Sequence, residues 1–221
     1  MKNEQNQKLR SITLTSGTIK DLSTTYDLLR IRGSVAFHQD IRTKKISTHG
    51  YSSFHYDVVA DVLKSSGSCV LKKYFDIKEI VNAGNLKIKK GQTIKINGSG
   101  RLTVEDIFQS EKVDLTGIVQ AKEIHTNQFQ LKLSGESFIE RLIADEAYIE
   151  KERITISLLR KKLICKYIKG RRLQISYTDA EIVEGDTVVI GENCNIQTLY
   201  YKEHYTISPN AKVQHIVRSE K

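Results

Sequence analysis

The sequence of 221 residues is poor in several residue types, and each shortage excludes a structural class. A single proline, Pro209, and many β-branched residues favour long uninterrupted sheet. The cysteines, Cys69, Cys165 and Cys194, are odd in number and form no Cys-x-x-Cys pair, so we expect neither a disulfide framework nor a structural zinc site. No run of about 18 apolar residues occurs and the first residues are polar, so we also expect no transmembrane helix and no signal peptide. Hydrophobic residues make up 39% of the chain and predict a folded, soluble protein.

Glycine recurs at a nearly constant spacing of 16 to 18 residues through most of the chain. The series is Gly17, Gly33, Gly50, Gly67, Gly84, Gly100, Gly117 and Gly135. Four positions after each glycine from the second onward the residue is apolar, at Phe37, Phe54, Leu71, Ile88, Val104, Ala121 and Ile139. Eight positions after it five of seven residues are apolar, and we interpret His125 in this column as an interior residue. Such columns predict repeated units that stack in register.

Between these columns polar and apolar residues alternate, which is typical of short β-strands. Known helical repeats need about 33 residues per unit and leucine-rich repeats about 20, so 17 residues are too few for either. Three short strands per unit predict one coil of an all-β parallel β-helix (β-solenoid), with about 17 residues per coil. The recurring glycine indicates a corner with positive φ or a close backbone approach. The alternative is an antiparallel sandwich, whose hairpins would place glycine at about half this spacing.

The repeat predicts a single domain. We expect a flexible N-terminal tail at residues 1–11, a β-helix domain at 12–217 and a C-terminal tail at 218–221. Gly170 follows Gly135 by 35 residues, which predicts two coils with the intervening glycine replaced near Glu152. The count gives 11 or 12 coils, and at about 4.8 Å per coil the rod would be roughly 50–55 Å long.

Motifs in the last 50 residues carry a family resemblance. Lys169–Leu173, followed by Tyr177-Thr178-x-Ala180, resembles the pattern x-G-D-x-I-x-L-x-x-T-x-A. Val183–Ile196 resembles V-x-G-x-x-V-x-I-G-P-G-C-x-I, and Leu199–Tyr201 stands where a Val-Glu-Tyr strand is common. Upstream, Ile96–Gly100 reads I-N-G-S-G. Through these motifs the chain resembles the bactofilins, polymer-forming cytoskeletal proteins of bacteria, and the longer Gram-positive forms in particular.

The resemblance implies a right-handed β-helix that associates end to end into filaments without bound nucleotide. It further implies a non-enzymatic scaffold without a cofactor, which localises cell-envelope or division proteins in the bacterial cytoplasm, often at the membrane periphery. The sequence departs from the family at Glu192-Asn193, where Pro-Gly is usual, and at Lys169, Arg171 and Arg172, where acids are common.

The sequence shows no convincing cap helix at either end of the stack. An open solenoid end exposes unpaired backbone groups and a slice of apolar core, which invites docking. We therefore predict a homopolymer whose interface includes Ile12, Leu14, Ile19, Leu199, Tyr200, Tyr205 and Ile207.

Basic residues cluster in one segment. Between Lys151 and Arg172 there are nine basic residues and one acid, Glu152, a net charge of +8 out of +9 for the chain. On a solenoid this segment predicts a basic belt, formed by Arg160, Lys161, Lys162, Lys166, Lys169, Arg171 and Arg172. The belt is either a solvated face or a docking surface for an acidic protein or an anionic membrane, which would gain about 1 kcal/mol per basic residue. Nucleic acid is disfavoured, because the sequence holds no recognised binding motif.

Three other function classes remain as alternatives. Gly185 and Gly191 are six residues apart, as in left-handed β-helix (hexapeptide-type) acyltransferases, but the 17-residue period is not a multiple of six. Polysaccharide lyases and hydrolases need clustered carboxylates, and the acids here do not recur at coil spacing. The third alternative is a monomeric solenoid that binds an acidic partner. The six histidines show no metal-ligand spacing, so no metal site is predicted.

Overall fold

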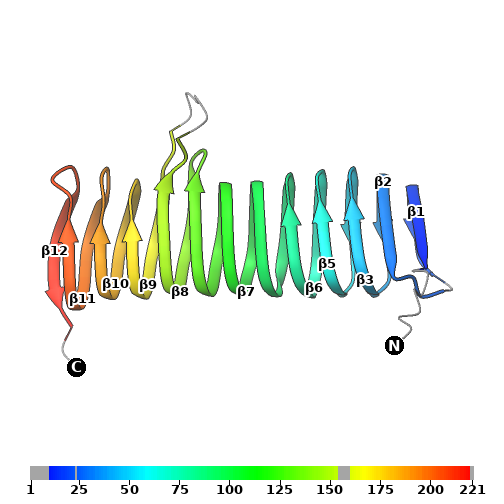
Figure 1. Cartoon of the computed structure of the whole chain (residues 1–221), viewed down its shortest axis with the longest axis horizontal. Helices are drawn as coiled ribbons and strands as arrows, with labels where there is room; N and C mark the ends of the chain where they lie inside the picture. Colours follow the sequence, from blue (N-terminus) through cyan, green and yellow to red (C-terminus); the bar gives the residue numbers. More distant parts are fainter. Residues whose placement is uncertain (1–9, 23, 154–159, 220–221) are drawn as a thin grey trace, which may run out of the picture.

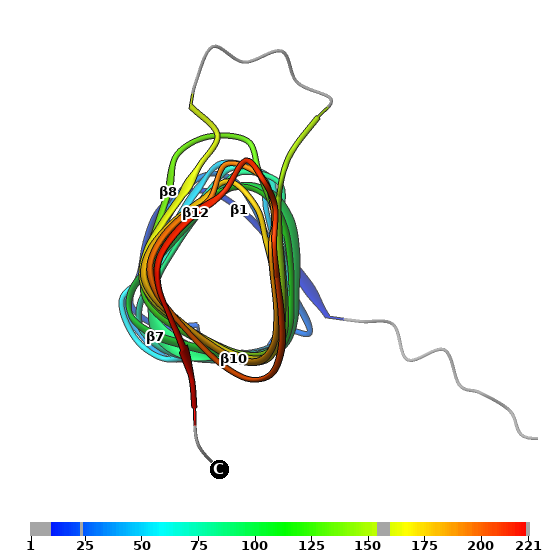
Figure 2. The same cartoon turned by 90° about the vertical axis from the view of Figure 1, so that its left-hand side faces the viewer.

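A computed structural model describes residues 10–22, 24–153 and 160–219. They form one parallel sheet wound into a β-solenoid of about 12 turns with roughly 17 residues per turn (Figure 1). Viewed along its axis the solenoid has three sides, and the chain winds right-handed from the N-terminus to the C-terminus (Figure 2). The predicted fold class is confirmed.

The strands run round the corners, so several are long. In chain order they are β1 (Ser11–Ile19), β2 (Leu28–Phe37), β3 (Ile41–Thr48), β4 (Tyr51–Phe54), β5 (Val58–Ser65), β6 (Ser68–Asn82), β7 (Asn85–Leu133), β8 (Ser137–Lys151), β9 (Leu163–Ile175), β10 (Thr178–Ile190), β11 (Asn195–Ile207) and β12 (Lys212–Arg218). Residues 1–9, most of the predicted N-terminal tail, lie outside the described residues.

Equivalent residues of successive coils stack directly above one another. Leu63 of β5 is in register with Ile80 of β6, and both are fully buried. Phe37 and Phe54 stack with ring centroids 4.8 Å apart and planes only 2° from parallel. Alternation along each strand places every second residue inside, so the core is a set of apolar ladders along the axis.

The stacked corner explains the recurring glycine. A Cβ on Gly67 would lie 2.1 Å from the carbonyl oxygen of Gly50, and one on Gly50 would lie 2.2 Å from that of Gly33. From Gly50 to Gly117 each glycine of the column therefore sits against the backbone of the glycine one coil before it. Close approach selects glycine at these positions, positive φ adds to the requirement at Gly100, and at Gly17 positive φ acts without a close approach.

The prediction that Gly170 continues this column is wrong. The corner continues through Glu152, whose N–H donates to Leu133 O, and then through Ser176, whose N–H donates to Ile149 O. Gly170 instead lies beside Ala144 at a different corner. The glycine series misleads here because one coil is lengthened to 26 residues, as the contact between Glu140 and Lys166 shows.

The additional residues of this coil, here called the excursion, fall in the sequence between Glu152 and Leu163, where pairing resumes with Ser137. Lys161 Nζ lies 2.9 Å from Glu152 Oε2 and 3.0 Å from Glu152 O. Both residues are only 7% exposed. A buried ion pair thus joins the two ends of the excursion.

The interpretation of His125 as an interior residue is also wrong. Its neighbour Ile124 is fully buried, whereas His125 is half-buried on the outer face. Some coils before His125 have 16 residues instead of 17, so the interior position falls one residue earlier than the column predicts. Gly91 likewise occupies the interior position that the column assigned to Gln92, and Phe75 and Phe108 fill the space on either side of it, with centroids 6.1 Å apart.

Candidate functional site at the ends and outer face of the solenoid

Among the described residues, the N-terminal end is an uncovered strand edge. β1 is the first strand in the sheet order, so one of its edges faces away from the protein. Three of its apolar side chains continue buried core ladders of β2: Ile12 with Leu29, Leu14 with Ile31, and Ile19 with Phe37. The β2 residues are at most 1% exposed, while their β1 counterparts are only partly buried. The end therefore presents an uncovered slice of core.

The C-terminal end is bare in two places. β12 covers β11 only from Asn195 to Tyr201, so the rest of β11 forms a free edge beside the edge of β12. Tyr205 and Ile207 continue the ladders of Val188 and Ile190, which are buried. Both are only partly buried themselves. This edge corresponds to the N-terminal one, because Tyr205 and Ile207 end the inward columns that Ile12 and Leu14 begin.

Two of the predicted interface residues lie beneath β12. Leu199 is fully buried and in register with Ile216, and half-buried Tyr200 is in register with Val217. The outermost residues are Ile216 and Val217, which are 42% and 41% exposed. Sequence analysis missed them, although the apolar pair three residues after Val213 was the available signal. Within the described part of the chain no helix covers either end.

The basic belt is paired with acids, which come from neighbouring coils except in the pair of Lys161 with Glu152. The ion pairs are Arg160 and Lys162 with Asp179, Lys161 with Glu152, Lys166 with Glu140, Lys169 with Glu184, Arg171 with Asp145, and Arg172 with Glu146. All seven predicted belt residues therefore have an acidic partner. The belt neutralises the coils on either side of it, and a docking role for it stays a prediction.

The ion pairs shift the pKa values of their members. A hydrogen bond with Lys166 holds the pKa of Glu140 below its ordinary value of 4.5, and the same contact raises the pKa of Lys166. Hydrogen bonds from Lys169 and then Tyr167 lower the pKa of Glu184. The Tyr167 hydroxyl lies 2.5 Å from Glu184 Oε2. The carboxylates of Glu140 and Glu184 and the ammonium of Lys166 stay charged through the neutral pH range, so their ion pairs persist there.

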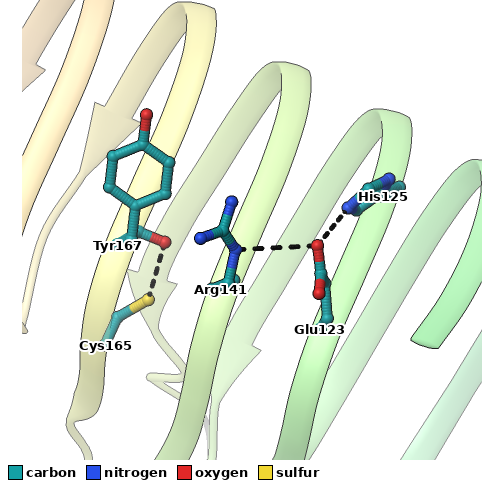
Figure 3. A network of polar contacts seen from close by, with 5 residues as sticks. All are labelled: Glu123, His125, Arg141, Cys165 and Tyr167. Carbon is teal, nitrogen blue, oxygen red and sulfur yellow. Dashed lines mark hydrogen bonds and ion pairs between the residues drawn. The ribbon is translucent and has the colours of Figure 1, made fainter. Parts of the chain in front are cut away.

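Polar contacts also tie successive coils together on the outer face (Figure 3). Glu123 Oε1 lies 2.6 Å from His125 Nε2 and 3.6 Å from Arg141 Nε one coil later. The guanidinium carbon of Arg141 lies 5.2 Å from the ring centroid of Tyr167, a cation–π contact. Cys165 Sγ donates to the carbonyl oxygen of Tyr167 at 3.4 Å. His125 is thus part of an inter-coil network.

A groove of about 730 Å³ runs past this network along the rod. Its floor includes the small residues Thr126, Ala144, Gly170 and Gly185, which occupy equivalent positions in successive coils. Side chains of both signs line its walls, so the groove has no single charge character.

The three cysteines are buried. Desolvation raises the pKa of Cys69 to about 11, of Cys165 to about 12 and of Cys194 to about 11. Each thiol is therefore protonated at neutral pH and packs as a small apolar side chain.

Comparison with known proteins gives two similar chains. The sequence is 30% identical over 96 residues to the uncharacterized protein YhbE of Bacillus subtilis (strain 168), covering 41% of this chain and 40% of YhbE. It is 25% identical over 92 residues to the uncharacterized protein YhbF of the same organism, covering 41% of this chain and 39% of YhbF. The chain therefore matches about two fifths of the length of these curated relatives. No protein-family model and no solved structure matches it.

None of the described residues belongs to a helix long and apolar enough to cross a membrane.

Proposed function

We propose that the protein is a non-enzymatic scaffold that assembles end to end into filaments without nucleotide and localises partner proteins of the cell envelope or division machinery along them. The observation that carries this proposal is the state of the two ends. Each terminal strand leaves backbone groups unpaired, and each leaves apolar members of the core ladders partly uncovered. An uncapped solenoid end is a template for further sheet.

Docking at the ends would pair the free backbone groups and cover the partly exposed apolar side chains at the same time. A second copy stacked on an end would pair the free N–H and C=O groups and cover apolar side chains such as Leu14 or Ile207. Burial of apolar area contributes about 25 cal/mol per Å², so each added contact favours association. The resemblance of the C-terminal motifs to bactofilins supports the same arrangement. The role in localising partners rests on that resemblance.

Substitutions at the two ends test the proposal. Leu14→Asp and Ile207→Asp each place a charge where the next copy would dock, and each should convert fast-sedimenting polymers into short species. A matched control is Ile94→Asp, because Ile94 is 49% exposed on the side of the rod. The control should sediment like the wild type.

Sedimentation velocity without nucleotide distinguishes polymers from single rods. If both end variants polymerise like the wild type, the ends are not the interface. If the wild type sediments as single rods at high protein concentration, the chain is a monomeric solenoid and the filament proposal fails.

A further inference from the structure

One outward column of side chains changes character along the rod. It consists of the residues that directly follow the buried column from Phe37 to Ile196. From the middle of the rod onward its members alternate in charge, at Glu105, Lys122, Glu140, Lys166 and Glu181, and the last member, Gln197, is neutral. Before that point every member is basic: His38, His55, Lys72 and Lys89.

The basic members contact one another instead of acids. The rings of His38 and His55 stack with centroids 4.0 Å apart. Lys72 Nζ lies 3.2 Å from His55 Nε2. Lys73 and Lys90 lie beside the column, with Lys90 in register with Tyr74. Within the described part of the chain the four lysines, Lys72, Lys73, Lys89 and Lys90, form no ion pair with an acid. We call these four lysines, together with His38 and His55 at one end, the cationic strip, whose formal charge comes from the lysines.

Lys72 and Lys89 carry like charges one coil apart and repel each other, whereas farther along the same column acids and bases alternate and attract. The repulsion is relieved when an anionic partner lies along the strip. The tyrosines beside it supply contact area, because Tyr56 and Tyr74 are 49% and 39% exposed. Tyrosine is enriched in interfaces for this reason.

The strip is narrow. Asp40 and Asp57 stand at the corner next to it, where they accept the N–H groups of Asp57 and Tyr74. Glu105, paired with Lys87 at 2.8 Å, closes its far end. A flat anionic membrane laid on this ridge would also approach these carboxylates. A slender partner would not.

An acidic stripe on an α-helix has matching dimensions. Carboxylates at i, i+4 and i+7 repeat at about one helical pitch, 5.4 Å, against about 4.8 Å between coils. Four members of the column span roughly 14 Å, the length of about ten helical residues. We propose that the cationic strip is a docking site for an acidic helical stripe of a partner protein. The proposal holds for a single rod as well as for a filament.

A pair of synthetic peptides tests it. One has about 21 residues of alanine with glutamate at i, i+4 and i+7 repeats, and the other has the same composition with the glutamates spread around the helix. At low salt the striped peptide should bind the full chain about tenfold more tightly than the scrambled one, by fluorescence anisotropy.

A charge-matched variant separates the strip from net charge. Changing Lys72, Lys73, Lys89 and Lys90 to Gln should weaken binding of the striped peptide by about tenfold or more. The control changes Lys45, Lys64, Lys95 and Lys112 to Gln, which removes the same charge from another side of the rod and should weaken binding by no more than about twofold. Equal weakening by both variants, or equal binding of the two peptides, would overturn the proposal.

A separate experiment with lipid vesicles tests whether the strip binds a membrane instead. Vesicles of phosphatidylglycerol and phosphatidylcholine should not select between the wild type and the strip variant. If they do, and the striped peptide does not, the strip is a lipid-binding surface and the proposed helical partner is wrong.

Discussion

The two halves of the rod carry the same outward column but use it differently. In the C-terminal half, Glu140 and Lys166 stand one coil apart and pair at 2.9 Å. In the N-terminal half, Lys72 stands between His55 and Lys89 and forms no ion pair with an acid among the described residues. In this column, therefore, the C-terminal half pairs its charges between coils, whereas the lysines of the N-terminal half stay open to solvent and to partners.

The difference teaches that linear charge counts mislead in a solenoid. Residues 136–150 hold five acids and one base, and residues 173–192 hold five acids and no base. These segments lie on either side of the belt in the stack, so the most basic segment of the sequence is the most completely paired. Within the described ranges, the four lysines of the cationic strip in the N-terminal half form no ion pair with an acid.

We expect the largest loss of stability when the buried ion pair of the C-terminal half is broken. Lys161→Met would remove the ammonium that lies 2.9 Å from the Glu152 carboxylate, in a pair whose side chains are only 3% and 8% exposed. We expect the free energy of unfolding to fall by about 3–5 kcal/mol. Urea denaturation followed by circular dichroism measures it.

The control for this prediction is the double variant Lys161→Met/Glu152→Leu. Replacing both charges should recover most of the loss, because the buried carboxylate is then removed together with the ammonium. If the double variant is as unstable as the single one, the excursion is not held by the ion pair.

The N-terminal half should depend instead on its stacked glycines. Gly67→Ala would place a Cβ 2.1 Å from the carbonyl oxygen of Gly50 and should cost about 2–3 kcal/mol of unfolding free energy. Gly135→Ala is the matched control, since its Cβ would meet only the mobile end of Ile118 at 2.9 Å. It should cost less than about 1 kcal/mol. Equal effects of the two substitutions on the urea midpoint would show that stacking is not what selects glycine.

Charge reversal in the shared column should have opposite signs in the two halves. Lys72→Glu places an acid between His55 and Lys89 and should raise Tm by about 1–2 °C. Lys166→Glu places a third acid beside Glu140 and Glu181 and should lower Tm by a similar amount, about 1–2 °C. Differential scanning calorimetry at low salt gives both values. Shifts of the same sign would break the comparison.

The smallest expected effect is a pH response confined to the N-terminal half. Burial, then the charges of Lys72 and His38, lower the pKa of His55 below 6.5. The unfolded chain therefore binds the proton more readily, so this contribution is complete above about pH 6.5 and is lost as the pH falls through the folded pKa. The pKa values of Glu140 and Glu184 are also lowered, so their contribution is lost only as the pH falls below about 4.5.

Between pH 7.5 and 5.5 the Tm of the wild type should fall more than that of His55→Gln. A Glu140→Gln variant should follow the wild-type profile over this range and diverge only in more acidic buffer. Parallel profiles for the wild type and His55→Gln would remove the assigned role of the stacked histidines.

The winding was predictable because the spacing of glycine and apolar residues along the sequence repeats once per coil. Glycine at one corner and an apolar residue such as Phe54 or Leu71 four positions later repeat with the coil, and stacking in register requires both. The prediction failed where a coil changed length. Loss of one residue before Gln92 moved the interior position to Gly91, and the excursion after Glu152 shifted Gly170 to another corner.

Contacts between coils were beyond reach of the sequence for the same reason. Arg172 meets Glu146 across 26 residues, a separation that no regular repeat of 17 specifies. The bare ends were predictable as apolar termini, but burial of Leu199 depends on how far β12 extends. Which acids pair with the belt depends on the register between coils. The sequence of the belt itself does not determine that register.

Electron microscopy of the purified chain without nucleotide distinguishes an end-to-end polymer from a monomeric solenoid. We predict unbranched filaments one solenoid wide and many times longer than the roughly 55 Å rod that 12 coils would form. Isolated rods of that length at every protein concentration would contradict it.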